Sequence, residues 1–415
     1  MLFKTILNKC YKFKSFIYEN VRFSPDQRSI EIEIIPRSNS SPICSLCGKP
    51  APGYDTSKTS RQFSFIPIYN IPVTLFYYMR RVECSTCGIV TEAVPWAIGR
   101  SSVCIPFKLL LANWAKALSW QETARRFRTT WFHVRESIGY VVDWGLSQRN
   151  MNGITAIGVD EIAWKLGHVY LTLVYQLDSG CKRLLWVARD RTVRSLLGFF
   201  RELGRERCSL IKYVCSDMWK PYLKVIRRKV AQAVHILDRF HIIQKINMAI
   251  DEIRASEHRR LHAEGDLTLK HTRWCILKRP ENLTEKQQVK LKDLLRYNLQ
   301  SVRAYLLKED FQNFWNYASS TWALKFLDGW LTKVMRSRLE PLKKVAKTLR
   351  RHRDLIMNWF KAKGGVSTGV VEGFNNKIKV TTRKSYGFRT YKCMEMALYH
   401  QLGGLPEPQL THRFF

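Results

Sequence analysis

The sequence predicts a multidomain α/β protein, because segments of very different character follow one another along the chain. Two C-x-x-C pairs, Cys44 to Cys47 and Cys84 to Cys87, mark an N-terminal segment with strand-like runs. Ile154–Asp238 contains short apolar strands that alternate with helical patterns, which is typical of a mixed sheet with helices on its faces. From about 251 to 364 the pattern is helical and strongly basic. A zinc-ribbon-like module, a sheet core and a large basic helical segment are therefore expected.

Length and charge narrow the class of partner. The 415 residues suffice for two to four domains and a large core, and the formal net charge of +35 is too high for an ordinary enzyme of small molecules. Such an excess predicts a polyanionic partner, with nucleic acid ahead of a membrane surface, because no apolar run is long enough to span a bilayer. The N-terminus lacks the features of a secretory signal. Of the eleven cysteines, four form two C-x-x-C pairs and seven are scattered, which fits a reducing compartment, so a cytoplasmic location is expected.

The two C-x-x-C pairs predict a structural zinc site. Each pair places two thiolates on one tight turn, and the glycine that follows it, Gly48 or Gly88, permits the bend. Four sulfurs form a closed tetrahedral set that suits Zn²⁺ and leaves no open position for catalysis. The alternative is two unrelated thiol pairs in a core, but strand-like runs at Phe63–Ile68 and Val73–Met79 favour a ribbon or small sheet around a metal. The predicted ligands are Cys44, Cys47, Cys84 and Cys87.

A helix-turn-helix is predicted after the zinc module. Leu109–Ala117 is helical by pattern, and Ser119 and Glu122 form an S-x-x-E capping box that opens a second helix. A third helix follows a break at Arg128–Thr130, and its first residues would read DNA. The alternative is an ordinary helical hairpin that bridges two domains. The residues expected to contact DNA here are Trp131, His133 and Arg135.

The segment that starts at Ile154 carries two acidic residues on predicted strands. Asp160 lies on the first strand and Asp217 ends the fourth, so parallel neighbours would bring the two carboxylates close together. A turn at Asp178–Gly180 suggests an antiparallel hairpin. The predicted strands are Ala156–Trp164, His168–Leu177, Arg183–Ala188, Ile211–Asp217 and Ala233–Asp238, with a helix at Val193–Leu203.

A single acidic residue, Glu372, stands among many basic ones in Ser367–Tyr391. Read as a helix, this segment puts a polar face, Glu372, Asn375, Asn376 and Lys379, beside an apolar stripe, Val371, Phe374 and Ile378. The carboxylate either neutralises its neighbours or holds a metal ion against a polyanion that they bind, and the periodicity favours the second. The residues expected to contact DNA here are Asn375, Asn376, Lys377, Lys379, Arg383 and Lys384.

Two carboxylates on neighbouring strands and a third on a packed helix can hold a pair of divalent cations for phosphoryl transfer. Oxygen ligands favour Mg²⁺ or Mn²⁺ over zinc. Taken singly, an aspartate at a strand end is usually structural, and the value of these residues lies in the ordered set. Asp238 is a rival ligand, and His241 is expected to position or pack rather than catalyse. Glu161 should point to the other side of its strand from Asp160.

The complete set of motifs resembles the DDE transposases of the bacterial insertion-sequence family ISL-three (ISL3) over nearly the full chain. The resemblance rests on the double zinc knuckle, the helix-turn-helix, G-V-D-E, C-S-D-M-W-K-P-Y, L-D-R-F-H and V-E-G-F-N-N-K-I-K with its later Y-G-F-R. It implies a ribonuclease-H-like catalytic core in which Asp160, Asp217 and Glu372 are the metal ligands. It also implies hydrolytic nicking at the transposon ends, attack of the freed 3′-hydroxyl on target DNA, and a homo-oligomer that joins two ends. The location that it implies is nucleoid-associated.

Two further functions stay open: a non-catalytic DNA-binding regulator derived from a transposase, and a metal-dependent junction nuclease on the same core. The presence of all three carboxylates favours the transposase over the regulator. Within the insertion that the family is expected to have, leucines from Leu291 to Leu306 show helical spacing, and the charges of Lys343–Arg353 favour phosphate contact over a solvated face. The predicted domains are zinc-binding 1–100, helix-turn-helix 101–150, first part of the core 151–250, helical insertion 251–364, Glu-bearing helix 365–402 and C-terminal tail 403–415.

Overall fold

The computed structural model describes residues 3–165, 167, 169–362 and 369–408. They belong to two compact units, Met1–Asn150 with Lys377–Phe415 and Met151–Asn376, and the boundary falls within one helix, α15 (Gly369–Lys384). Parts of the predicted organisation lie outside the described residues, namely the strand start at His168, the boundary between 364 and 365, and residues 409–415 of the tail.

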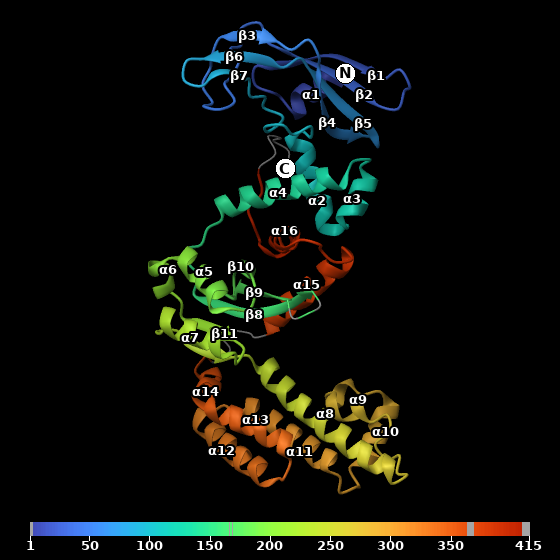
Figure 1. Cartoon of the computed structure of the whole chain (residues 1–415), viewed down its shortest axis with the longest axis vertical. Helices are drawn as coiled ribbons and strands as arrows, with labels where there is room; N and C mark the ends of the chain where they lie inside the picture. Colours follow the sequence, from blue (N-terminus) through green and yellow to red (C-terminus); the bar gives the residue numbers. More distant parts are fainter. Residues whose placement is uncertain (1–2, 166, 168, 363–368, 409–415) are drawn as a thin grey trace. The chain divides into compact units, whose positions relative to one another are not determined.

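The first unit begins with a four-stranded sheet in the order β1-β2-β5-β4, in which β2 and β5 are parallel and the other pairs antiparallel (Figure 1). In β2 the run I-E-I-E-I buries every second side chain, as strand geometry requires. Trp96 is fully buried against Phe16 and Tyr77, with ring centroids 4.9 and 5.2 Å away. The elements are α1 (Phe3–Cys10), β1 (Phe16–Phe23), β2 (Ile30–Pro36), β4 (Arg61–Ile68) and β5 (Ile71–Tyr77).

A second, three-stranded antiparallel sheet carries the second cysteine pair, and Cys44 of the first pair forms an isolated bridge with Glu92. Its order is β3-β6-β7, and β6 ends at Cys84. Glu92 is buried, and its carboxylate accepts a 2.5 Å hydrogen bond from the Tyr77 hydroxyl and pairs with Arg80 at 2.7 Å. This carboxylate joins the two sheets, because Tyr77 ends β5 and Arg80 begins β6. The elements are β3 (Gly53–Thr56), β6 (Arg80–Cys84) and β7 (Gly88–Thr91).

The outcome for the N-terminal strands is mixed. The runs predicted at Phe63–Ile68 and Val73–Met79 are confirmed as β4 and β5, but they belong to the four-stranded sheet and not to the sheet with the cysteines. Strands β1 and β2 were not predicted, although the alternation in β2 is the ordinary signal of a half-buried strand. The cysteine spacing gives no indication of this separate core, because none of the four cysteines lies in it.

Three helices follow as predicted. They are α2 (Ile105–Ala117), α3 (Trp120–Arg126) and α4 (Trp131–Gln148), and α16 (Tyr391–Leu402) completes the group. Ser119 Oγ accepts a hydrogen bond from the backbone N–H of Glu122 at 3.2 Å, so the predicted cap is present. The Glu122 carboxylate accepts a hydrogen bond from the Ser119 hydroxyl and not from the Ser119 backbone N–H. Only one of the two side chain to backbone bonds of a capping box is therefore present. The start of α2 at Ile105 is earlier than predicted, because Pro106 suits a first helical turn.

His400 on α16 gives this unit a pH-dependent stability. Neither ring nitrogen has a hydrogen-bond partner among the described residues, and burial, with the nearby cations Lys116 and Lys384, lowers the pKa of His400 to about 3. Because the pKa of His400 is lower in the folded than in the unfolded chain, its contribution to stability is fully present at pH values above about 6.5, the pKa of an unfolded histidine. This contribution is lost as the pH falls toward 3. We expect His400 to lower the free energy of unfolding by up to roughly 1.4 kcal/mol per pH unit on acidification.

Chemical denaturation between about pH 7.5 and 4.5 tests this expectation. His400→Leu should flatten the acid limb of the stability profile, while His262→Gln, a change at an exposed histidine, should leave it unaltered. An identical acid limb in His400→Leu and wild type would show that another group causes the loss.

The second unit is built on a five-stranded mixed sheet in the order β10-β9-β8-β11-β12. The pairs β8–β9 and β9–β10 are antiparallel, and β11 is parallel to both β8 and β12. The predicted hairpin, the helix at Val193–Leu203 and the parallel pairing of the Asp160 strand are all confirmed. The elements are β8 (Ala156–Lys165), β9 (Val169–Gln176), β10 (Arg183–Arg189), α5 (Val193–Leu203), α6 (Arg205–Ser209), β11 (Tyr213–Ser216), α7 (Lys220–Lys229) and β12 (Val234–Leu237).

The two faces of this sheet are packed differently. Val159 belongs to an apolar cluster with residues of α5 and α7, such as Phe199 and Tyr222. Gly158, on the alternate face, lies under α15, where a Cβ atom would stand only 2.8 Å from a methyl carbon of Val371. A glycine at this position therefore lets the Glu372-bearing helix approach the strand that carries Asp160.

Residues 239–362 form an all-helical body with its own apolar core (Figure 1). The predicted continuous spacing from Leu291 to Leu306 is interrupted, because α10 ends at Leu294 and α11 begins at Gln300, and Leu295 and Leu306 are exposed. No helix among the described residues has the length and apolar character needed to cross a membrane. The elements are α8 (Arg239–Ala263), α9 (Arg273–Leu277), η1 (Pro280–Asn282), α10 (Glu285–Leu294), α11 (Gln300–Gln312), η2 (Asn313–Asn316), α12 (Ser320–Arg336), α13 (Glu340–Arg351) and α14 (Arg353–Ala362).

Candidate active site

Asp160 and Asp217 are brought together by the register of two parallel strands. Val159 of β8 lies opposite Ser216 of β11, so each aspartate follows directly after a paired residue. The Asp160 side chain is almost fully buried and the Asp217 side chain is 13 % exposed. Asp217 Oδ1 accepts a 3.0 Å hydrogen bond from the Trp219 backbone N–H, which fixes its orientation. Burial raises the pKa of Asp217, and the neighbouring charge of Asp160 acts in the same direction.

Asp238 lies at the next strand end. Its backbone N–H donates to the Ser216 carbonyl at 2.9 Å, and its side chain caps α8 by accepting from the Phe240 N–H at 2.9 Å. Burial raises the pKa of Asp238 to about 6, helped by the negative charges of Asp160 and Glu372. The rival ligand considered from the sequence is therefore within electrostatic reach of both carboxylates, and it has a structural role as a helix cap.

His241 contacts these carboxylates directly. Its Nε2 atom is 3.5 Å from Asp160 Oδ1 and 3.9 Å from Asp238 Oδ2. Burial alone would lower the pKa of His241, but the carboxylates of Asp160, Asp238 and Asp217 outweigh it and raise the value to about 9. At neutral pH this imidazole is a cation, so it balances part of the negative charge. The sequence suggested a positioning role, and the contacts agree with it.

Arg191 is a functional candidate that sequence reasoning missed. Its guanidinium pairs with Glu161 Oε1 at 2.7 Å, lies 3.5 Å from Asp217 Oδ2, and stands over the Trp219 ring at 4.4 Å. Burial raises the pKa of Glu161 to about 7, with Asp217 adding to the shift and Arg191 opposing it. Glu161 was expected to point to the other side of β8 from Asp160, yet the Arg191 guanidinium connects it to Asp217. In the sequence, Arg191 is only a basic residue two positions after the end of a strand, and such residues are too common to be singled out.

Helix α15 docks through its apolar stripe, as predicted. Val371, Phe374 and Ile378 are buried, and the Phe374 ring stacks on Tyr175 of β9 with centroids 4.7 Å apart and planes 5° from parallel. Glu372 is exposed on the neighbouring face of the helix. Phe374, and Val371 beside Gly158, therefore set the first part of the helix on the sheet, while its one carboxylate stays accessible.

The amide of Asn375 ties this helix to Asp160. Asn375 Nδ2 donates to Asp160 Oδ2 at 2.5 Å, and Asn375 Oδ1 accepts from the Tyr175 hydroxyl at 3.1 Å. Both ends of the amide are thus engaged with the protein, and the predicted DNA contact of Asn375 would require these bonds to open. Asn376, the next residue, is exposed.

Asn375→Ala is expected to lower the free energy of unfolding by about 1–3 kcal/mol, because it leaves a buried carboxylate oxygen and a buried phenol without a partner. The matched change Asn376→Ala should stay within about 0.5 kcal/mol of wild type, since that side chain is exposed. Denaturant titration of both variants measures the difference. Equal stability of the two would show that the Asn375 bonds contribute nothing net.

The other residues predicted to contact DNA lie in varied settings. Trp131 is 41 % exposed, whereas His133 is held by Thr129 Oγ1 at 2.9 Å, and Arg135 is half-buried. Lys384 donates to the Lys116 carbonyl at 2.9 Å. Of the residues predicted to contact DNA, those that are exposed on α15 are Asn376, Lys377, Lys379 and Arg383.

The four predicted zinc ligands converge. The sulfur atoms of Cys44, Cys47, Cys84 and Cys87 all lie within 4.8 Å of one another, and in the described part of the chain no other group of three or more His, Cys, Asp or Glu residues is so close. Both glycines of the knuckles have positive φ, 71° and 73°, as predicted for Gly48 and Gly88. The donor set therefore fits a tetrahedral zinc ion.

Electrostatics of the cluster favour a bound cation. Backbone N–H groups of Thr86 and Cys87 lower the pKa of Cys84 to about 7, which promotes a thiolate. Desolvation and the three neighbouring thiols raise the pKa of Cys87 to about 12, so the sulfurs oppose one another's ionisation. A divalent metal removes this conflict, because it stabilises all of the thiolates together.

Comparison with known proteins agrees with the motifs. The family described as Transposase, the ISL3 group of DDE transposases, matches residues 157–398. The chain is 29 % identical over 411 residues to the transposase for insertion sequence element IS1557 of Mycobacterium tuberculosis, covering 92 % of this chain and 91 % of that protein. It is 26 % identical over 394 residues to the transposase for IS1001 of Bordetella parapertussis, covering 94 % and 96 %. The family match spans more than half of the chain, including the strands and the helix of the candidate site. The chain belongs to the ISL3 family of DDE transposases.

Proposed function

We propose that this transposase binds the ends of its insertion sequence and cuts and joins DNA there, with Asp160, Asp217 and Glu372 as ligands of catalytic Mg²⁺ or Mn²⁺. The observation that carries the proposal is the register of β8 and β11, which sets Asp160 beside Asp217, next to a Glu372-bearing helix held by the Asn375 amide. Two antiparallel strand pairs followed by two parallel pairs support a ribonuclease-H-like core.

The residues fit divalent cations. Asp160, Asp217, Asp238 and Glu161 concentrate negative charge in a partly buried site, and the cations that contact them are Arg191 and His241. Bound Mg²⁺ or Mn²⁺ would supply Lewis-acid activation of the scissile phosphate and would ease deprotonation of the attacking hydroxyl. Asp160 is held for this role by Asn375 and His241. The Arg191 guanidinium would compete with a metal ion for the Asp217 carboxylate. It therefore balances the negative charge of Asp217 when no metal is bound.

We propose the following order of chemistry at these carboxylates. Water attacks the phosphorus at the element end, the bond to the 3′-oxygen breaks, and a 3′-hydroxyl is released. That hydroxyl then attacks a phosphorus of target DNA, and one phosphodiester bond forms as another breaks. No serine, cysteine or tyrosine nucleophile is required, which fits a site made of carboxylates.

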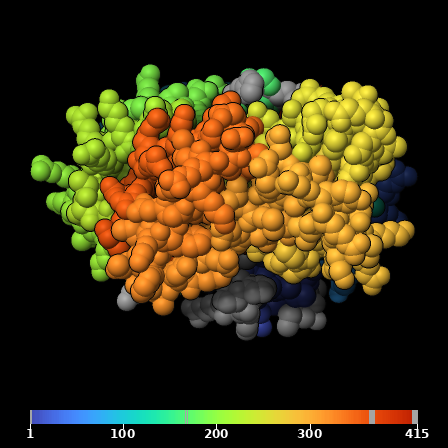
Figure 2. All heavy atoms as spheres, turned by 90° about the horizontal axis from the view of Figure 1, so that it is seen from below, coloured from blue at the N-terminus to red at the C-terminus, as the bar shows by residue number. Residues whose placement is uncertain are grey.

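Duplex DNA is the proposed partner at several surfaces. Exposed cations on α13, Lys344, Lys347, Arg350 and Arg351, lie on the helical body whose outer surface is seen in Figure 2. Their pattern suits contacts to phosphates, which give affinity without sequence readout. Start residues of α4 would add sequence readout at the ends. We also propose that two or more copies act together, because two ends must be joined, and that zinc at the four cysteines holds the β3-β6-β7 sheet in shape.

A strand-cleavage assay tests this function. Purified protein is mixed with labelled DNA that spans the boundary of its element, in Mg²⁺, in Mn²⁺ or in EDTA. Metal-dependent nicks at the boundary and joined products are expected. Metal-dependent cutting without a requirement for the ends, and without joining, would favour a junction nuclease. Salt-sensitive binding of the ends without cleavage in either metal would favour a DNA-binding regulator.

A further inference from the structure

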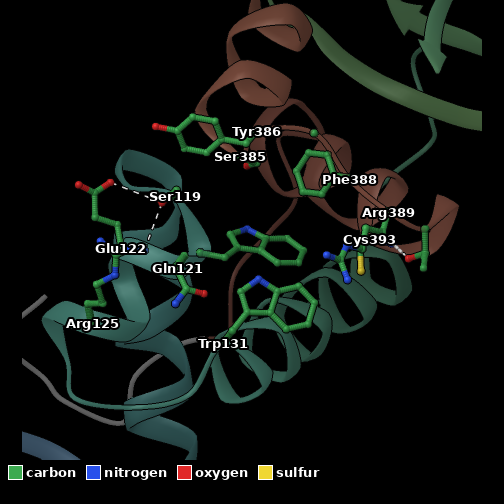
Figure 3. A pocket seen from close by; sticks show the side chains of 13 residues that line it. Ser119, Gln121, Glu122, Arg125, Trp131, Ser385, Tyr386, Phe388, Arg389 and Cys393 are labelled. Carbon is green, nitrogen blue, oxygen red and sulfur yellow. Dashed lines mark hydrogen bonds between the residues drawn. The ribbon is translucent and has the colours of Figure 1, made fainter. Parts of the chain in front are cut away.

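A cavity of about 740 Å³ lies in the first unit, between the helix-turn-helix and the segment that follows α15 (Figure 3). Its walls come from α3, from the first residue of α4 and from residues 385–393, so it joins the Y-G-F-R motif at 386–389 to the helix-turn-helix. The volume is within the range of about 300–1,000 Å³ that is typical of sites for small ligands. None of the cleavage chemistry uses this cavity.

Aromatic rings make up much of its wall. Trp120 packs against Trp131 with centroids 5.7 Å apart and planes tilted by 43°, and Phe388 meets Trp120 edge-on at 5.6 Å. Trp120 is buried, but 41 % of Trp131 is exposed. The Trp120 ring thus supports Trp131 from behind, and the remaining surface of Trp131 is available to a flat ligand with a π-face.

Tyr386 adds a second aromatic ring at the rim. It is fully exposed, and its φ of 52° lies in the left-handed region that bulky residues rarely adopt. Gly387 follows with φ of 90°, so two successive residues turn the chain sharply here. Figure 3 shows Tyr386 reaching out on the side of Ser119. Phe388 instead packs on the Trp120 ring. A strained turn that displays an aromatic side chain to solvent indicates a contact surface.

Polar groups at the cavity have both signs. Glu122 and Arg125 stand on one side, and Arg389 on the other (Figure 3). Nucleobase edges present N–H donors that a carboxylate can accept, as well as oxygen and nitrogen acceptors that Gln121 can meet. Glu122 would repel a phosphate inside the cavity, whereas the arginines would attract phosphates at its edge. The charge pattern therefore suits a base inside and backbone phosphates outside.

We propose that this cavity binds an unpaired nucleobase of a DNA strand, which stacks on Trp131, while Tyr386 at the rim contacts the neighbouring part of the strand. The proposal rests on the proposed function, because it presupposes that DNA reaches the helix-turn-helix. A base within a duplex is stacked on both faces and cannot enter, so the ligand is a base that is extruded, bulged or in a single strand. The cavity thus gives the transposase a means to hold DNA that is locally unpaired.

The test compares two DNA duplexes of the same end sequence, one fully paired and one with a single bulged 2-aminopurine. Full-length wild-type protein should bind the bulged duplex roughly tenfold more tightly, and stacking should quench the probe. Trp131→Ala and Tyr386→Ala should each bring the ratio of the two dissociation constants toward one. Phe132→Ala is the matched control, because Phe132 is 58 % exposed beside Trp131 and does not line the cavity.

The Tyr386→Ala variant should fold like the wild type, because the Tyr386 side chain is fully exposed and its removal costs no packing. Its effect on the ratio therefore does not depend on a change in folding. A wild-type ratio near one with normal binding of the paired duplex would overturn the cavity proposal and leave the proposed function standing. A ratio that survives in both variants would overturn it as well. Failure to bind either duplex would remove the proposed DNA-binding function together with the cavity proposal.

Discussion

Asp160→Asn is expected to reduce strand cleavage by about 10³-fold or more, while the affinity for end DNA stays within about twofold of wild type. The substitution removes one negative charge and keeps nearly the same shape. Asp160 is almost fully buried and accepts the Asn375 amide at 2.5 Å, a bond that an amide oxygen can also accept. The fold and the docking of α15 are therefore retained, and the loss is confined to metal binding.

Gel analysis of nicked end DNA and a separate binding titration measure the two effects. Asp190→Asn is the control, because Asp190 is an exposed carboxylate near the site whose left-handed backbone, φ 65°, asparagine tolerates. Asp217→Asn and Glu372→Gln should match Asp160→Asn. If Glu372→Gln cleaved normally and Asp238→Asn did not, Asp238 would be the third ligand.

Much of the sheet core followed from the sequence alone. Strands were predictable because each apolar run is short and ends at a turn or an acidic residue, and parallel pairing of two such strands is enough to place Asp160 beside Asp217. The stripe of Val371, Phe374 and Ile378 was predictable because helical periodicity is regular over the whole segment. Local pattern thus located the carboxylates and the helix that packs over them.

Contacts between distant residues were not predictable in this way. Arg191 and Glu161 are thirty residues apart in sequence, and only strand order brings the guanidinium between Glu161 and Asp217. The Asn375 amide was predicted to face DNA because it shares the polar side of α15, yet the sheet beneath supplies Asp160 as its partner. Side-chain partners depend on tertiary distances, and these are not encoded in the periodicity of a single segment.

Removal of zinc is expected to unfold the small β3-β6-β7 sheet and to weaken binding of DNA, without direct loss of the carboxylate site. The wild-type chain should contain one zinc ion. Strong chelation, or Cys44→Ser or Cys87→Ser, should release it and expose the segment around 44–91 to protease. The reason is that this sheet has a small core of its own, in which Cys44, Cys84 and Val82 are prominent members. Small modules of this kind depend on the metal for folding.

Metal analysis, limited proteolysis and end-DNA binding check this expectation together. Cys181→Ser is the matched control, because Cys181 is exposed and lies outside the cluster. A zinc-free chain that resists protease and binds DNA normally would mean that the buried Glu92, with Tyr77 and Arg80, holds the sheet without metal. We expect loss of structure without zinc, because the four sulfurs lie within 4.8 Å of one another and cannot all ionise without a cation between them.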